Sequence, residues 1–178
     1  MCESQAWLSK RKIEIPEDRY KSDLELHDRF QDFSAELLKL ALSGIAVFGV
    51  FLSVLAGKDT FDEVRVAMQS SLFKGLSAGA LLAFGTSVLL ALWHRFLASD
   101  GMYHHFRAIK LLILLEKPGE NPQYNDLANA AGIISEAEND ESLRNSKFEK
   151  SELCLIWSAV FLIIGSFLLA GAFFSVVL

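Results

Sequence analysis

Three long apolar runs without a charged residue dominate the hydrophobic pattern of the chain. They cover Leu40 to Gly57 (18 residues), Gly75 to Trp93 (19 residues) and Leu153 to Leu178 (26 residues). A helix needs about 20 predominantly apolar residues to cross a hydrocarbon core of about 30 Å. The pattern therefore predicts an all-α integral membrane protein with three transmembrane helices and cytoplasmic helical extensions.

The segment before the first apolar run has the periodicity of an amphipathic helix. Its large apolar residues recur at intervals of 4, 3, 4 and 3: Leu26, Phe30, Phe33, Leu37 and Leu40. No Gly or Pro interrupts the pattern after Pro16, which suits the first position of a helix. We expect one helix of about forty residues, cytoplasmic in its first half, whose coiled-coil spacing makes it pack against another helix.

The chain beyond the second apolar run is expected to divide into shorter polar helices. Ser99, Asp100 and Gly101 predict a helix end or a new N-cap, and "KPGENP" (Lys117 to Pro122) predicts a second break. Residues 123–152 are polar and acidic, and they predict one or two helices, the last leading into the third apolar run. The expected order is a cytoplasmic N-terminal segment, a first span, a short external loop, a second span, a cytoplasmic helical segment and a third span: residues 1–36, 37–57, 58–74, 75–98, 99–152 and 153–178.

The distribution of Lys and Arg predicts the orientation in the membrane. Residues 1–36 and 99–152 hold six Lys or Arg each, whereas residues 58–74 hold three. Because positive residues near membrane ends concentrate on the cytoplasmic side, we expect the N-terminus inside and the C-terminus outside a bacterial cytoplasmic (inner) membrane. Trp93, Arg95 and Trp157 would then anchor the helices at the cytoplasmic headgroup level.

Composition argues against several classes of function. The net charge of −5 disfavours nucleic acid as a partner, because phosphate contacts need clustered Lys and Arg. Cys2 and Cys154 give no disulfide framework. Residues 1–36 hold nine acids and six bases, so the first apolar run is expected to be a retained anchor and not a secretory signal. The chain has no nucleophile elbow, P-loop or H-E-x-x-H motif, and we expect neither an enzyme nor a cofactor.

The stretch "LWHRFLASDGMYHHF" gathers three of the four histidines. Zinc accepts nitrogen and oxygen ligands, so a weak metal hypothesis names His94, Asp100, His104 and His105 as ligands. Adjacent residues on a helix point about 100° apart, however, which places His104 and His105 poorly for one ion. We favour amphipathic side chains at the headgroup level, with a pH-responsive role for the histidines as a further alternative.

Small residues follow one face of the second span at every fourth position: Gly75, Gly79, Ala83, Ser87 and Ala91. The first span carries a shorter version in Gly49 and Ser53. Such a stripe lets another helix backbone approach closely, which is how helices associate in lipid. Self-association of the chain and packing within one copy are equal alternatives.

The central parts of the spans contain no ionisable residue and no Pro, which argues against a coupled transporter. Their hydroxyl groups leave open a pore made by several subunits, lined by Ser43, Ser53, Thr86, Ser87, Ser158 and Ser166. Outside the spans, carboxylates cluster at Glu136, Glu138, Asp140 and Glu141, and we expect them to form a solvated charge run.

In outline, residues 17–117 resemble small bacterial membrane effectors of the SLATT type, with a cytoplasmic helix, a tight pair of spans and further cytoplasmic helices. The resemblance implies a membrane-perturbing output of a defence system; the third span departs from it, and it carries no functional residue. Our first hypothesis is a non-enzymatic multi-pass membrane protein that acts through helix association and a cytoplasmic interaction module. Its partners would be the lipid bilayer and a second copy or another membrane or cytoplasmic protein. The alternatives are an oligomeric channel or membrane-perturbing effector and a metal-dependent membrane enzyme.

Overall fold

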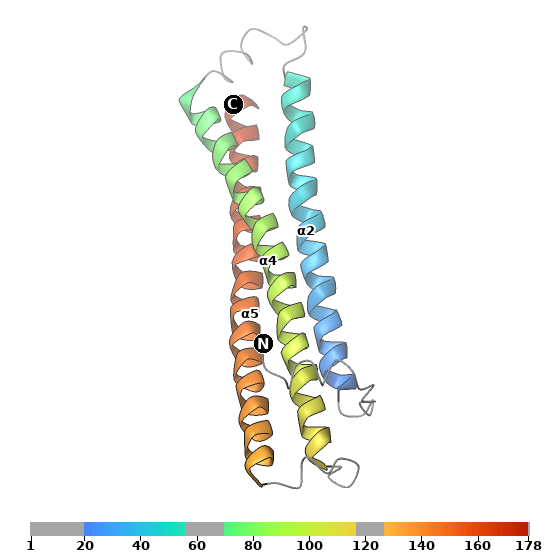
Figure 1. Cartoon of the computed structure of the whole chain (residues 1–178). Coiled ribbons are helices and arrows are strands. Elements are labelled where there is room, and N and C mark those ends of the chain that lie inside the picture. Colours follow the sequence, from blue (N-terminus) through green and yellow to red (C-terminus); the bar gives the residue numbers. More distant parts are fainter. Residues whose placement is uncertain (1–19, 56–69, 117–126, 178) are drawn as a thin grey trace. The chain divides into compact units, whose positions relative to one another are not determined.

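The computed structural model describes residues 20–55, 70–116 and 127–177, and these form three long helices (Figure 1). They are α2 (Lys21–Leu55), α4 (Ser71–Glu116) and α5 (Leu127–Val177). Apart from Tyr20 and Ser70, every described residue is helical, and the described ranges contain no strand. The all-α prediction is therefore confirmed, and each helix includes a segment long and apolar enough to cross a membrane.

Helix α2 joins the amphipathic segment to the first apolar run without a break over its 35 residues, as the periodicity predicted. The expected start at Pro16, the loop residues 58–69 and the predicted break at Lys117 to Pro122 lie outside the described residues. Helix α5 is a single helix of 51 residues that continues into the third apolar run. Of the two alternatives predicted for this polar segment, one helix or two, the structure has one.

The predicted break at Ser99 to Gly101 is wrong, because α4 continues through it over 46 residues. A helix-interior glycine costs about 1 kcal/mol relative to alanine, so local propensity alone favoured an end here. Contacts with α5 outweigh that preference. Asp100 forms an ion pair with Lys147, and a Cβ on Gly101 would lie 3.5 Å from the ring of Phe148.

The chain forms two compact units, which are described separately. Of the described residues, the polar unit comprises 20–28, 99–116 and 127–148, and the apolar unit comprises 29–55, 70–98 and 149–177. The polar unit has a small buried cluster, made of Leu111, Ile133 and Ala137.

The apolar unit contains segments of all three helices in mutual contact. Phe30 of α2 lies edge-on to His94 of α4, with 6.5 Å between ring centroids, and Phe51 lies 6.4 Å from Phe73. The later residue on α2 thus contacts the earlier residue on α4, so these two helices are antiparallel. The rings of Phe51 and Phe173 lie 3.8 Å apart, so α2 also touches α5 directly.

Helix α5 runs antiparallel to α4 in the apolar unit and therefore parallel to α2. This direction follows because Ser87 bonds to Ser158 while His94 bonds to Ser151, further back along α5. The core between the three helices is apolar, and its buried residues are Phe48, Ala80, Phe84 and Leu169.

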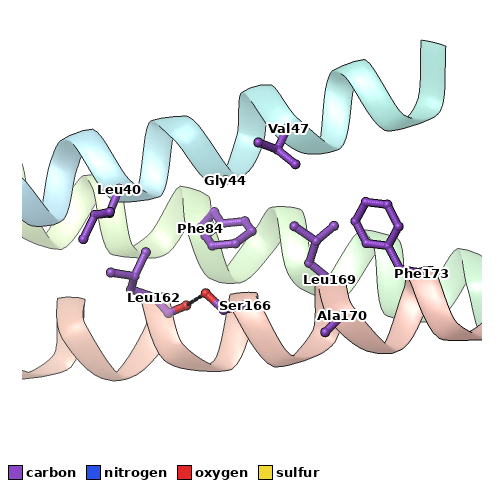
Figure 2. A pocket seen from close by; sticks show the side chains of 9 residues that line it. All are labelled: Leu40, Gly44, Val47, Phe84, Leu162, Ser166, Leu169, Ala170 and Phe173. Carbon is purple, nitrogen blue, oxygen red and sulfur yellow. Dashed lines mark hydrogen bonds between the residues drawn. The ribbon is translucent and has the colours of Figure 1, made fainter. Parts of the chain in front are cut away.

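Phe84 sits in this core between two glycines. A Cβ on Gly44 of α2 would lie 2.7 Å from Cζ of the Phe84 ring, and a Cβ on Gly165 of α5 would lie 3.0 Å from Cδ1. Carbon atoms in favourable contact are about 3.5–4.0 Å apart, so only glycine leaves room for the ring on both sides. The two glycines therefore let α2 and α5 pack directly against the Phe84 ring of α4 (Figure 2).

Candidate functional site

An ion-pair cluster around one buried carboxylate joins α4 to α5 in the polar unit. Its centre is Asp140 of α5, which is 1% exposed. Nδ1 of His104 lies 2.9 Å from Oδ1 of Asp140, and Nε of Arg107 lies 3.3 Å from Oδ2. Arg107 also forms an ion pair with Glu136, one turn earlier on α5. We name His104, Arg107, Glu136 and Asp140 the charged cluster.

The charged cluster corrects one sequence prediction. The carboxylates from Glu136 to Glu141 were expected to be solvated, and Glu138 and Glu141 are indeed exposed, but Asp140 is fully buried. The physical reason is pairing across the helices, because a buried carboxylate is tolerated when cations and hydrogen-bond donors surround it. The periodicity of α5 alone did not reveal which carboxylate faces α4.

A second set of polar contacts surrounds His105, which is 7% exposed. Nη1 of Arg144 lies 2.8 Å from Nδ1 of His105, and Oδ2 of Asp23 lies 2.9 Å from Nε2. A guanidinium can only donate, so Nδ1 must accept and the ring proton must reside on Nε2. Burial lowers the pKa of His105 from 6.5, and the charge of Arg144 lowers it further, whereas Asp23 and Glu141 raise it. The contacts thus favour a neutral imidazole.

A further ion pair between α4 and α5 in the polar unit involves Asp100. Its Oδ2 lies 2.8 Å from Nζ of Lys147. The hydrogen bond from this ammonium lowers the pKa of the Asp100 carboxyl below its usual value of 3.8. The ionisable side chains that the sequence suggested as zinc ligands are therefore engaged in helix contacts.

The fourth weak zinc candidate, His94, belongs to the apolar unit and contacts Ser151. Nδ1 of His94 lies 2.9 Å from the Ser151 carbonyl oxygen and 2.8 Å from its Oγ. Nε2 is buried and has no hydrogen-bond partner in the structure. Each of the four candidates thus has a different partner. Within the described ranges, no group of three or more His, Cys, Asp or Glu side chains is arranged to hold a metal ion.

Two serines form a reciprocal hydrogen-bond pair between α4 and α5 of the apolar unit. Oγ of Ser87 donates to the Ser158 carbonyl at 2.8 Å, and Oγ of Ser158 donates to the Ser87 carbonyl at 2.9 Å. Both residues are fully buried. Their hydroxyls are therefore satisfied inside one chain, and they stabilise the contact between two apolar helices.

The small-residue stripe lies partly in the same contact. Ala83, Ser87 and Ala91 are buried, and a Cβ on Gly79 would lie 3.2 Å from Cδ1 of Leu168 on α5. Gly75 and Gly49 have nothing within 4 Å of an added Cβ, and Ser53 is exposed. Most of the stripe of the second span thus packs within one copy, whereas the shorter version in the first span faces outward.

The three expected interface anchors point away from the core. Trp93 and Trp157 are 56% and 53% exposed, and they lie beside Phe96 and Phe161 on their own helices. Arg95 is also exposed, and its Nε donates to Gln31 Oε1 at 2.9 Å.

Three contacting groups of the site were not found from the sequence: the Phe84 ring with Gly44 and Gly165, the pair of Ser87 and Ser158, and the charged cluster. The glycines gave one weak signal, because a glycine inside a helix is unfavourable and usually has a packing reason. The other two groups depend on which residues of distant helices come to the same level. That information is absent from local spacing.

Comparison with known proteins finds no relative of this chain. No family model matches the chain, and neither a curated protein nor a solved structure matches it significantly.

Proposed function

We propose that this chain is a multi-pass membrane protein in which α2, α4 and α5 each cross the bilayer once. In this proposal it acts without catalysis, through helix–helix association in the bilayer and through the polar unit, which serves as a cytoplasmic interaction module. The N-terminus and residues 99–152 face the cytoplasm of a bacterial cell, and the C-terminus faces outward.

The observation that supports membrane insertion best is the outer surface of the apolar helices. Of the most apolar windows of α2, α4 and α5, only 17%, 33% and 22% is buried within the chain. Large side chains project outward on all three helices, such as Val50 (65% exposed), Leu82 (72%) and Phe167 (75%). Water-soluble monomers rarely expose apolar patches above a few hundred Å², whereas lipid solvates such surfaces at no cost.

The contacts of the polar groups support a binding role over a catalytic one. In the charged cluster and around His105, acidic side chains pair with basic side chains or histidines of another helix among α4, α5 and the beginning of α2. Buried ionic groups of this kind specify which helices pair and in which register. Exposed side chains such as Tyr103 (61% exposed) then remain for contact with a partner.

Reporter fusions test the topology. A phosphatase that is active only outside the cytoplasm should be active when fused after residue 60 or residue 178, and inactive after residue 120. The positive-inside imbalance of Lys and Arg is the physical basis of this expectation. Phosphatase activity at residue 120 would overturn it.

Site-specific photo-cross-linking tests the interaction module. A photoreactive amino acid at Tyr103, in the polar unit, should give a discrete adduct in cells. The same residue at Leu89, which is 69% exposed in the second span, serves as the control for nonspecific capture. Adducts at Leu89 alone would contradict a cytoplasmic module. Ion or dye release from liposomes that contain the purified chain would replace the proposal with the channel alternative.

A further inference from the structure

Two adjacent histidines of α4 have opposite hydrogen-bonding roles in the polar unit. Nδ1 of His104 faces a carboxylate oxygen, Oδ1 of Asp140, at 2.9 Å. Nδ1 of His105 faces a guanidinium nitrogen, Nη1 of Arg144, at 2.8 Å. An ionised carboxylate can only accept a hydrogen bond, and a guanidinium can only donate one. Nδ1 therefore carries a proton in His104 and none in His105.

The two rings must respond differently when they take up a second proton. In His104 this proton binds to Nε2, and the positive charge of the ring is favoured by the carboxylate of Asp140. In His105 the proton binds to Nδ1, which then becomes a donor 2.8 Å from another donor, Nη1 of Arg144. Both groups also carry positive charge, so they repel each other. The hydrogen bond between His105 and Arg144 is therefore incompatible with a protonated ring.

His105 lies where three helices of the polar unit meet. Its Nε2 lies 2.9 Å from Oδ2 of Asp23, in the first turn of α2, and its Nδ1 contacts α5 through Arg144. The neighbouring ring of Phe106 meets Tyr20 edge-on, with 5.4 Å between centroids, which holds the beginning of α2 at the same level. His105 is 7% exposed, so water has little access to either nitrogen. The neutral ring thus links α2 and α5 to α4 at one point.

Three charged groups from the two neighbouring helices act on His105. Arg144 of α5 opposes a positive charge on the ring, whereas Asp23 of α2 and Glu141 of α5 favour it. Arg144 also has partners on its own helix: Nη2 lies 3.3 Å from Oε1 of Glu141, and Nε donates to Oδ1 of Asn145 at 3.2 Å. A guanidinium released from His105 therefore stays paired on α5, while a protonated ring stays paired with Asp23.

We propose that His105 is a proton-operated switch of the polar unit. In its neutral form the ring links α2, α4 and α5. Uptake of one proton from the solvent at Nδ1 breaks the bond to Arg144 and turns the contact with Asp23 into an ion pair. The ring then links α2 and α4 alone, and the guanidinium of Arg144 loses its bond to α4.

The switch operates on acidification and leaves the other contacts between α4 and α5 in place. Burial and the charge of Arg144 lower the pKa of His105 from 6.5, so the ring is neutral at neutral pH. The pKa of Asp100 is lowered from 3.8, so its ion pair with Lys147 persists in mild acid. The change is thus confined to the surroundings of His105. It gives the proposed interaction module two surfaces near Arg144, one in neutral and one in acidic conditions, and it does not depend on membrane insertion.

Nitrogen-15 NMR of the histidine rings tests the protonation states in the full chain, purified in mild detergent. At neutral pH we expect the proton on Nε2 in His105 and on Nδ1 in His104, with signals assigned through His105→Gln and His104→Gln. His105 should titrate with a midpoint below 6.5. Arg144→Gln should raise this midpoint because it removes the opposing charge, and Asp23→Asn should lower it because it removes a favourable one.

Double-mutant cycles test whether protonation exchanges the contacts. Unfolding constants from thermal loss of circular dichroism give the coupling of His105 with Arg144, which should be favourable at neutral pH and disappear in acid. The coupling of His105 with Asp23 should instead grow in acid by roughly two- to fivefold, because the contact gains charge. The coupling of His104 with Asp140 is the matched control and should persist in acid.

A histidine that only packs between helices would give couplings that do not change with pH, and this result would overturn the switch. A proton on Nδ1 of His105 at neutral pH would also overturn it, as would midpoint shifts of the same direction in Arg144→Gln and Asp23→Asn. Where a variant does not fold, the unsubstituted chain still decides. A His105 ring that stays neutral until the polar unit unfolds in acid would contradict the proposal.

Discussion

Replacing Gly44 by alanine tests whether the Phe84 ring fixes the packing of the apolar unit. The added Cβ would lie 2.7 Å from Cζ and 2.8 Å from Cε1 of Phe84. The ring cannot withdraw, because the Gly165 backbone stands on its other side at a hypothetical Cβ distance of 3.0 Å. Either the helices must separate or the ring must leave its rotamer.

The size of the effect follows from two opposing contributions. Overpacking a well-packed core costs about 1–3 kcal/mol. Alanine in place of glycine stabilises a helix by about 1 kcal/mol, because its helix propensity is higher. Gly49→Ala on the same helix receives the same propensity gain, but nothing lies within 4 Å of its Cβ. The difference between the two variants is therefore the packing cost, about 1–3 kcal/mol, or roughly a 5- to 150-fold change in the unfolding equilibrium.

Unfolding in mild detergent with increasing sodium dodecyl sulfate measures this difference. Trp93 and Trp157 lie in the apolar unit, so their fluorescence should change when the helices of this unit separate. Gly44→Ala should unfold at lower denaturant than Gly49→Ala, and the loss should vanish when Phe84→Ala removes the ring, since the two positions are coupled. Equal midpoints for Gly44→Ala and Gly49→Ala would refute the tight contact. A loss that persists with Phe84→Ala would show that the ring is not its cause.

Three further predictions concern the polar contacts. Asp140→Ala leaves Arg107 without its buried partner and should destabilise the polar unit by about 3 kcal/mol, measured by thermal loss of helical circular dichroism, whereas Glu138→Ala, on the exposed face, should have little effect. The pKa of His105 is lowered from 6.5 on folding, so the unfolded chain binds the proton more readily. Stability should therefore fall as the pH drops below 6.5, and His105→Gln should make this pH dependence shallower; an unchanged profile would contradict the assignment. Ser158→Ala breaks the reciprocal bond with Ser87 and should cost about 1 kcal/mol in the same unfolding assay, while Ser166→Ala, whose hydroxyl bonds only within α5, should be neutral.

The helices could be predicted from the sequence because their signals are local. An uncharged run such as Gly75 to Trp93 excludes loops, and the apolar repeat from Leu26 to Leu40 has the helical period. The continuation of α4 through Ser99 to Gly101 could not be predicted in this way. It depends on contacts of Asp100 and Gly101 with residues of α5 that lie more than forty positions later in the sequence.

The polar contacts were less predictable, because they depend on the alignment of distant helices. His104 and Asp140 are 36 residues apart, and His94 and Ser151 are 57 apart. A shift of one residue in either helix would turn Asp140 about 100° away from α4. Residue types in the histidine stretch suggested a shared site, whereas the structure gives each side chain a partner of its own.

Phe84 also limits the ways in which the apolar unit can change shape. Sliding α2 by one helical turn, about 5.4 Å, would bring Leu40 or Phe48 to the place of Gly44, and the same shift of α5 would replace Gly165 by Phe161 or Leu169. Neither helix then leaves space for the ring, so ratchet-like sliding past α4 is blocked. Tilting about the ring is still allowed, because it keeps both glycines in place. Within the apolar unit the ring therefore lets α2 and α5 change their crossing angles with α4, while it prevents either helix from shifting along its axis.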